Sequence, residues 1–274
     1  MNVKQLENTA HKLRRNVVNM IGAGYRGHFG GSLSCAELVT ALYFYKMKHD
    51  PKNPRQEDRD RFILSKGHSS PILYAALGES GYFDKQHFET LKDLGSILQG
   101  HPDMLKTPGV EANTGSLGQG LSIGVGMALG LRMDGKQSRV YVILGDGEMG
   151  EGQVWEAGMV AAHYKLSNLV AILDHNKVQA MGFTCDRINT GSLAEKWKAF
   201  GWHVMEIGGH NMEEIITALN AADEVTDKPV MIIAHTIKGK GVSFAENTAA
   251  FHNNLMTKEQ LEQAIVEINA KINE

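Results

Sequence analysis

Two positions thirty residues apart have the residue types that hold a metal ion next to a phosphate. Asp146 follows the apolar run 140–144 within the sequence Gly-Asp-Gly-Glu, and Asn176 follows the apolar run 169–173. Hard oxygen ligands suit Mg2+, which takes one or two protein carboxylates together with phosphate oxygens of its ligand. The glycines beside Asp146 would let backbone N–H groups approach that phosphate at a helix N-terminus. Either motif alone is compatible with a simple turn or cap, but the pair at this spacing predicts a magnesium and phosphate site.

The surrounding residues predict strands and helices in alternation. Apolar runs without polar alternation are typical of strands buried on both faces, and they occur at 61–64, 140–144, 169–173 and 230–234. Helices are expected in the first twenty residues, from the capping box Ser34–Glu37 through Tyr45, at 152–164, at 211–222 after Asn211, and onward from the capping box Thr257–Gln260. The pattern predicts one α/β domain with a doubly wound, mainly parallel sheet flanked by helices. Since ligands bind at the carboxyl ends of such strands, Asp146 and Asn176 should converge.

Four of the twelve histidines stand beside glycine or a turn in expected loops, where a side chain can enter a cleft: His28, His68, His101 and His252. Imidazole titrates near neutrality, so it can hydrogen-bond sugar hydroxyls and move a proton at a developing alkoxide. We expect ordinary packed or solvated roles for His11, His49, His87, His163, His203, His210 and His235. The role of His175, beside the expected metal ligand, is left open.

Composition excludes several classes of protein. The chain has 274 residues, 42% of them hydrophobic, which is enough to fill a sizeable core. A formal net charge of -3 gives no electrostatic reason to expect nucleic acid or an anionic membrane as partner. Cys35 and Cys185 lie too far apart, and without the right neighbours, to suggest a disulfide scaffold or a zinc site. Reduced thiols, a polar N-terminal segment and a glycine-rich stretch at 117–131 that is too short to span a bilayer favour a cytoplasmic protein.

Two glycine-rich motifs are weaker candidates for phosphate binding. The segment 22–27 formally fits the GxGxxG pattern of dinucleotide sites, but that pattern needs a preceding strand, and a charged amphipathic helix is expected there instead. We therefore exclude a Rossmann-type NAD site. The segment Lys238-Gly-Lys-Gly241 is compatible with a phosphate loop or with a solvated basic turn.

Several longer motifs, in order along the chain, resemble the transketolase family. They are Gly27–Ser34, Arg59–His68, Gly100–Asp103, Thr114–Gly120 and the Gly-Asp-Gly motif at 145–147 with Asn176, and together they extend the resemblance from about residue 10 to 257. The last of them resembles the thiamine diphosphate-binding motif. The resemblance implies the diphosphate-binding type of the thiamine diphosphate-binding fold, with thiamine diphosphate and Mg2+ as cofactors.

The resemblance also implies a role for each matching residue. Mg2+ would be held by Asp146, Asn176 and the backbone carbonyl of Val178. The cofactor would be contacted at its diphosphate by His68, Gly147 and His252 and bordered at its aminopyrimidine by Gly115 and Leu117, with Glu151 at a subunit-contact position behind it. The substrate channel would be lined by His28, His101 and His252, and the loop at 238–241 would close over the cofactor.

The implied reaction is transfer of a two-carbon ketol unit from a ketose phosphate to an aldose phosphate, as in the pentose phosphate pathway. In this family the glutamate that contacts the aminopyrimidine, and most arginines that grip sugar phosphate, lie on a later, pyrimidine-binding domain. The sequence stops before such a domain. We therefore expect residues 1–274 to form a single diphosphate-binding domain, without the pyrimidine-binding and C-terminal domains. It would be inactive alone and would assemble, as α2β2, with a separate subunit that carries the pyrimidine-binding domain.

Three departures from the family pattern keep alternatives open. Phe29 stands where proline is usual, Asn253 where glycine is usual, and Ala180-Met-Gly182 where apolar-Asp-Gly is commoner. Phe29 is expected to border the substrate channel, which brings the standard pentose-phosphate donor into question. The same module in another thiamine-dependent C–C bond enzyme acting on an unusual sugar, and a non-catalytic binding or regulatory module, are the alternatives. A Mg2+-dependent phosphatase is disfavoured, because no motif supplies its general base or aspartate nucleophile.

Overall fold

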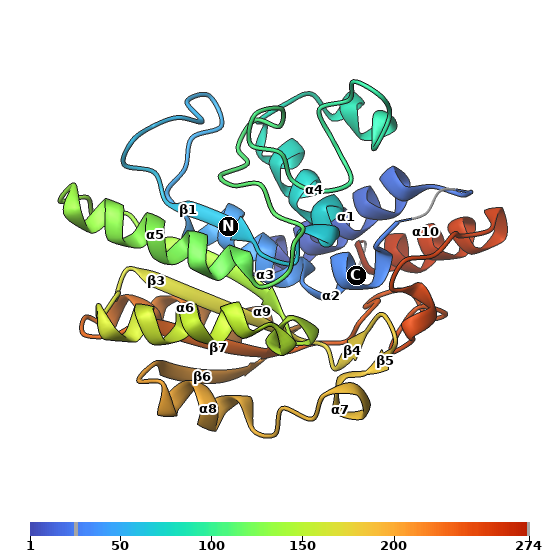
Figure 1. Ribbon diagram of the computed structural model, residues 1–274. Helices are drawn as coiled ribbons and strands as arrows, with labels where there is room; N and C mark the ends of the chain where they lie inside the picture. The colour runs from blue at the N-terminus through green and yellow to red at the C-terminus, as the bar shows by residue number, and fades with distance from the viewer. Residues whose placement is uncertain (25–26, 273–274) are drawn as a thin grey trace.

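A parallel sheet forms the centre of the molecule (Figure 1). The computed structural model describes residues 1–24 and 27–272. The strands of the sheet are β1 (Arg61–Leu64), β2 (Val140–Gly145), β3 (Leu169–His175), β6 (His203–Gly208) and β7 (Val230–His235). They lie in the order β1-β2-β3-β7-β6, and every neighbouring pair is parallel. The predicted α/β class with a mainly parallel sheet is therefore confirmed.

Helices cover both faces of the sheet (Figure 1). One face is covered by α1 (Val3–Ile21), α2 (Phe29–Ser34), α3 (Ala36–Ala41), α4 (Ser70–Ser80), α9 (Met212–Ala221) and α10 (Lys258–Ile272). The other is covered by α5 (Gln119–Met133), α6 (Gly152–His163) and α8 (Leu193–Ala199). Successive strand residues join opposite cores, with Tyr141 and Ile143 in the first and Val142 and Leu144 in the second. This alternation follows from the pleat and requires strands that are apolar on both faces.

Short elements complete the chain between these layers. A two-stranded antiparallel ribbon is formed by β4 (Val178–Gln179) and β5 (Gly182–Phe183) and leads into α7 (Thr184–Arg187). Helical turns are η1 (Leu42–Lys46, of π type), η2 (Gly67–Ser69), η3 (Lys85–Thr90), η4 (Gly147–Gly150), η5 (Ala222–Glu224) and η6 (Ala249–Phe251). Within the described ranges, no helix combines the length and the apolar character needed to cross a membrane.

Most of the expected elements are present, and their caps explain where they begin. The four expected strands correspond to β1, β2, β3 and β7, and the helices at 152–164 and 211–222 to α6 and α9. Asn211 caps α9 by accepting hydrogen bonds from the N–H groups of Glu213 and Glu214. Thr257 and Gln260 exchange the two hydrogen bonds of a capping box at the start of α10.

The predicted capping box at Ser34–Glu37 is wrong. Ser34 ends α2, and its Oγ lies 2.6 Å from a carboxylate oxygen of Asp174 on β3 instead of capping a helix. The expected single helix through Tyr45 is divided at Cys35 into α2 and α3 and ends in the π-type turn η1. The exclusion of a dinucleotide site agrees with the fold, since Gly22 ends helix α1 rather than following a strand. Tyr25 and Arg26 of that motif lie outside the described residues.

Two glycines of α5 face different surroundings, which gives a matched test of the packing. A Cβ added to Gly124 would lie 2.7 Å from a methyl group of Val142, whereas one added to Gly126 would meet nothing within 4 Å. We expect Gly124→Ala to lower the free energy of unfolding by about 1–3 kcal/mol through overpacking. Gly126→Ala should raise it by about 0.5–1 kcal/mol, because alanine favours the helix. Urea denaturation measures both, and equal effects would contradict the packing of α5 on β2.

Candidate active site

A cavity of about 340 Å³ lies at the carboxyl ends of β2 and β3. It brings together nearly all the residues singled out in the sequence, namely His28, His68, His101, Gly115, Leu117, Asp146, Gly147, Asn176, Val178 and His252. The exception is Glu151, which was expected at a subunit-contact position: it is the exposed N-cap residue of α6 and does not line the cavity, so its role stays a prediction. Residues from segments far apart in the sequence thus surround one space, as expected for ligands at the ends of parallel strands.

The two expected metal ligands that bind through their side chains, Asp146 and Asn176, directly follow neighbouring strands. Gly145 pairs with Asp174 in the parallel register, so Asp146 and Asn176 follow β2 and β3 at the same edge of the sheet. Asp146 accepts hydrogen bonds from the backbone N–H groups of Gly147, at 2.8 Å, and Lys177. Asn176 Oδ1 accepts one from the Val178 N–H at 3.1 Å. These contacts hold the oxygens of both side chains at the cavity before any ligand is bound.

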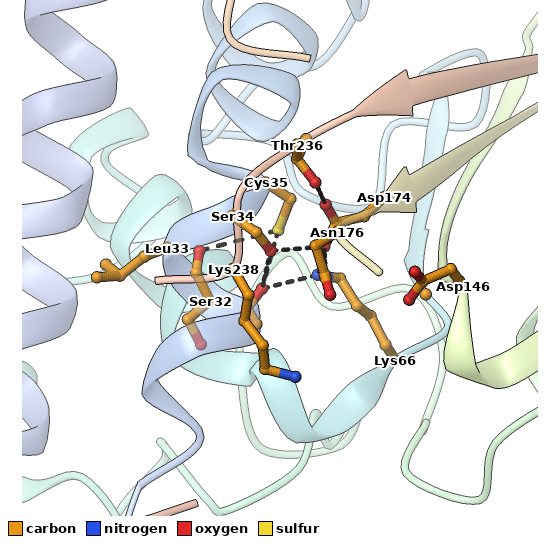
Figure 2. A network of polar contacts seen from close by, with 12 residues as sticks. Ser32, Leu33, Ser34, Cys35, Lys66, Asp146, Asp174, Asn176, Thr236 and Lys238 are labelled. Carbon is orange, nitrogen blue, oxygen red and sulfur yellow. Dashed lines mark hydrogen bonds and ion pairs between the residues drawn. The ribbon is translucent and has the colours of Figure 1, made fainter. Parts of the chain in front are cut away.

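Asp174 is the centre of a buried polar network (Figure 2). Its Oδ2 accepts hydrogen bonds from Ser34 Oγ at 2.6 Å and from Asn176 Nδ2 at 3.0 Å. The same oxygen forms an ion pair with Lys66 Nζ at 2.5 Å, while Oδ1 accepts from the Thr236 hydroxyl. Burial acts to raise the pKa of Asp174, but Lys66 and the donated hydrogen bonds outweigh it and lower the pKa. The bond to Nδ2 also fixes which way the Asn176 amide points.

Asp174 and Lys66 were not selected by sequence reasoning. Asp174 stands two residues before Asn176, where it looks like part of the same strand end, and Lys66 stands two residues before His68. Both are almost completely buried, and Lys66 Nζ donates a second hydrogen bond to the Gly31 carbonyl at 2.7 Å. The available signal was the position of Lys66 directly after the apolar run 61–64. A lysine so close to a buried strand is seldom buried unless it has a charged partner.

Lys238 is a second buried lysine at the cavity, and its surroundings differ. Its Nζ donates to the Val178 carbonyl at 2.6 Å and lies 2.8 Å from Nδ1 of His252. Burial, with Lys66 as a further cause, lowers the pKa of Lys238 to about 8. Since only 2% of this residue is exposed, the interpretation of the segment at 238–241 as a solvated basic turn is wrong for Lys238.

Three imidazoles face one another across the cavity. The ring centroid of His28 lies 4.9 Å from that of His68 and 5.4 Å from that of His252, and the centroids of His68 and His252 are 5.2 Å apart. Burial is the main cause that lowers the pKa of His28 to about 4 and that of His252 to about 3, and it lowers that of His68 as well. All three are therefore neutral at pH 7, and each can both donate and accept a hydrogen bond.

The segment carrying Gly115 and Leu117 is held against the strand ends by a buried carboxylate. Glu148 accepts hydrogen bonds from Ser65 Oγ at 2.5 Å and from the Gly118 N–H at 2.7 Å, and also from the Gly145 N–H. Gly115 adopts φ 148°, and a Cβ there would lie 2.8 Å from the His101 ring. Glycine at this position thus lets backbone and imidazole share the rim of the cavity.

The donor set fits a hard cation with an anionic ligand. Asp146 is 6% exposed, and burial together with the charge of Asp174 raises its pKa to about 6. Among the described residues, no basic side chain forms an ion pair with Asp146, so its charge lacks a close counterion. Those residues also contain no cluster of three acidic, histidine or cysteine side chains, so a metal here would depend on the Asn176 amide and the Val178 carbonyl as well. Such oxygen ligands suit Mg2+.

Three further residues named in the sequence analysis are Phe29, His210 and His175. The prediction that Phe29 borders the substrate channel is wrong, because Phe29 is 1% exposed and packs on Phe251 in the core. His210 is a structural residue that contacts Glu37 at 3.0 Å and accepts the Ile237 N–H. His175 lies against His235 and outside the main cavity.

Asp146 and Asp174 provide a direct test of this electrostatic arrangement. Asp174→Asn should lower the free energy of unfolding by about 3–5 kcal/mol, because it leaves Lys66 buried without its counterion. Asp146→Asn removes a buried charge that has no close counterion, so the ligand-free chain should melt at or above the temperature of the unchanged chain. Thermal unfolding followed by circular dichroism compares the two. An equal loss of stability would show that Asp146 is needed for the fold itself.

Comparison with known proteins assigns the family. Residues 5–269 match the family described as "Transketolase, thiamine diphosphate binding domain". The chain is 44% identical over 272 residues to a protein from Phocaeicola vulgatus that is named as one subunit of an apulose-4-phosphate transketolase, covering 99% of this chain and 96% of the relative. It is 47% identical over 263 residues to 6-deoxy-6-sulfo-D-fructose transketolase subunit SqwG from a Clostridium species, covering 96% of each.

Solved structures agree with these relatives. The transketolase of Campylobacter jejuni superimposes with a TM-score of 0.92 at 33% identity, over 98% of this chain and 43% of the solved one. The chain thus spans less than half the length of that transketolase, but nearly all of the relatives named as subunits. The resemblance seen in the sequence motifs is confirmed, and the chain belongs to the transketolase family, in which it matches the thiamine diphosphate-binding domain.

Proposed function

We propose that this chain is the diphosphate-binding subunit of a two-component transketolase that depends on thiamine diphosphate and Mg2+. The reaction would move a two-carbon ketol unit from a ketose phosphate to an aldose phosphate. The observation that carries the proposal is the convergence of Asp146, Asn176 and the Val178 carbonyl on a cavity that also contains Lys238. Oxygen ligands for a cation and a buried ammonium for an anion, side by side, suit a magnesium diphosphate.

Each part of the cofactor has residues suited to it. Asp146, Asn176 and the Val178 carbonyl would hold Mg2+, and the diphosphate would be bound by His68, Gly147, His252 and Lys238. Gly115 and Leu117 would border the aminopyrimidine. The bound cofactor supplies an electron sink that stabilises a carbanion on the transferred fragment. Glu148 and Asp174 would keep the surrounding backbone and the Asn176 amide in place.

The histidines would bind the sugar and handle its protons. His28 and His252 are neutral at pH 7. His28 can donate one hydrogen bond to a sugar hydroxyl and accept another, whereas Nδ1 of His252 accepts from Lys238, which leaves its Nε2 to donate. A neutral imidazole can take the proton of a sugar hydroxyl and return it, which is the function that C–C bond cleavage beside a hydroxyl requires. His101, exposed at the rim beside Gly115, would meet the substrate as it enters.

The proposal includes a second subunit. Residues 1–274 would form one diphosphate-binding domain, and the pyrimidine-binding and C-terminal domains would be supplied by another chain. Support comes from the relatives of matching length, which are named as transketolase subunits. We expect an α2β2 assembly, because paired domains of this kind would share active sites across a symmetric interface. A cytoplasmic location fits a partner and substrates of this class.

The sugar is the part of the proposal with a specific alternative. Relatives covering nearly the whole chain are named for apulose 4-phosphate and for 6-deoxy-6-sulfo-D-fructose. These names favour an unusual ketose, phosphorylated or otherwise anionic, over the common pentose-phosphate donor. Phe29 no longer bears on this choice, since it does not reach the cavity.

Reconstitution tests the proposed function. The protein that co-purifies with this chain in equimolar amount should, when recombined with it, transfer ketol units from one of a panel of ketoses that includes the two named above. Activity should require thiamine diphosphate, should be lost with EDTA and should return with Mg2+, because the cation binds the diphosphate to the protein. Robust turnover by this chain alone would contradict the two-component proposal, and Asp146→Asn serves as the inactive control.

His101 allows substrate binding to be separated from cofactor binding. In the reconstituted enzyme His101→Ala should lower kcat/KM at least about tenfold, by removing hydrogen bonds to the sugar. The dissociation constant for thiamine diphosphate should stay within about twofold. His163→Ala, exposed and outside the cavity, is the matched control. A variant that loses cofactor affinity but retains turnover at saturating cofactor would refute the substrate role.

A further inference from the structure

The two buried lysines at the cavity differ in how their charge is balanced. Lys66 forms an ion pair with Asp174 at 2.5 Å, so it contributes little net charge to the cavity. Lys238 donates to a neutral carbonyl and approaches a neutral imidazole. Among the described residues no carboxylate accepts a hydrogen bond from Lys238, and Figure 2 shows its amino group pointing away from Asp174. Lys238 is therefore a buried cation that the carboxylates of Asp146 and Asp174 influence only from beyond hydrogen-bonding distance, and an anionic ligand in the cavity would supply the close counterion.

The stem of Lys238 is confined. A Cβ on Gly30 would lie 2.9 Å from Cγ and 3.1 Å from Cε of Lys238, so this side chain passes directly over a glycine. The backbone beside it is tied down by hydrogen bonds from the Gly239 N–H to the Gly30 carbonyl and from the Asn247 N–H to the Lys238 carbonyl. The Lys238 ammonium is therefore buried at the cavity on a loop that is tied down on both sides.

The Lys238 ammonium lies directly beside an expected metal ligand, the Val178 carbonyl oxygen. The Val178 carbonyl oxygen that accepts its hydrogen bond is one of the three groups expected to hold the divalent cation. A cation bound there without an anion would share that oxygen with the ammonium, and like charges so close in a partly dry site repel strongly. An anionic diphosphate in the same cavity would attract both charges and remove this conflict.

We propose that Lys238 couples the binding of the two ligands, so that the chain binds the divalent cation weakly on its own and tightly only together with the diphosphate. The inference rests on the proposed function and adds to it an order of loading. By thermodynamic linkage the cation must increase affinity for the diphosphate by the same factor. The consequence is a site that does not fill with free Mg2+ in the absence of the cofactor.

Lys238→Met separates this coupling from simple anion binding. Mn2+, which accepts the same oxygen ligands, is titrated into the full chain and followed by its electron paramagnetic resonance signal, with and without saturating thiamine diphosphate. In Lys238→Met we expect Mn2+ alone to bind about tenfold more tightly than in the unchanged chain, since the competing charge is gone. Thiamine diphosphate should bind more weakly, and the factor by which each ligand enhances the other should fall.

Lys240→Met is the matched control, because Lys240 lies two residues along the same loop, partly exposed and near Glu246. It should leave both affinities unchanged. Misfolding could only weaken Mn2+ binding, so tighter binding in Lys238→Met is an outcome that structural damage cannot imitate. Equal or weaker binding of Mn2+ alone to Lys238→Met would overturn the inference. If the unchanged chain bound neither ligand in any combination, the proposed function would fail together with it.

Discussion

The buried carboxylate of Asp174 is the interaction on which the rest of the site depends. It connects the end of β3 to α2 through Ser34, to the segment after β1 through Lys66, to the segment after β7 through Thr236, and to Asn176 (Figure 2). A buried ion pair with good hydrogen bonds is costly to break from one side, by about 3–5 kcal/mol. These four segments at the cavity are thus fixed to one another by a single side chain, while Glu148 holds the segment that carries Gly115 and Leu117.

This arrangement leaves two charges at the cavity without close counterions. Asp146 and Lys238 are both buried, and burial shifts both pKa values toward the neutral forms, upward for Asp146 and downward for Lys238. Three imidazoles, neutral at pH 7, complete the lining without adding net charge. A ligand that carries both a cation and an anion satisfies Asp146 and Lys238 together, which is why a metal diphosphate fits better than either ion alone. Binding of such a ligand would therefore stabilise the folded chain.

Sequence patterns were sufficient for four of the five strands of the central sheet and for most of the cavity lining, but they did not identify β6 or the buried residues beneath the cavity. Buried parallel strands are continuous apolar runs, so β2 and β3 and the polar residues after them could be identified. Ser34 was misassigned because its spacing to Glu37 imitates a capping box, whereas its real partner, Asp174, is 140 residues away. Helix α5 was missed because a glycine-rich sequence resembles a loop, although Gly120 and Gly124 allow close packing on Ser65 and on β2. Long-range partners of this kind are not encoded in local spacing.

The central claim, that one cavity holds a divalent cation beside a diphosphate, is tested most directly by crystals grown with Mn2+ and thiamine diphosphate. Anomalous scattering from Mn2+ locates the cation independently of any phase bias. We predict a single strong peak among Asp146, Asn176 and the Val178 carbonyl, with the diphosphate between it and Lys238, and with the Lys66–Asp174 pair unchanged. A peak elsewhere on the chain, or a diphosphate bound away from Lys238 and Gly147, would contradict the account.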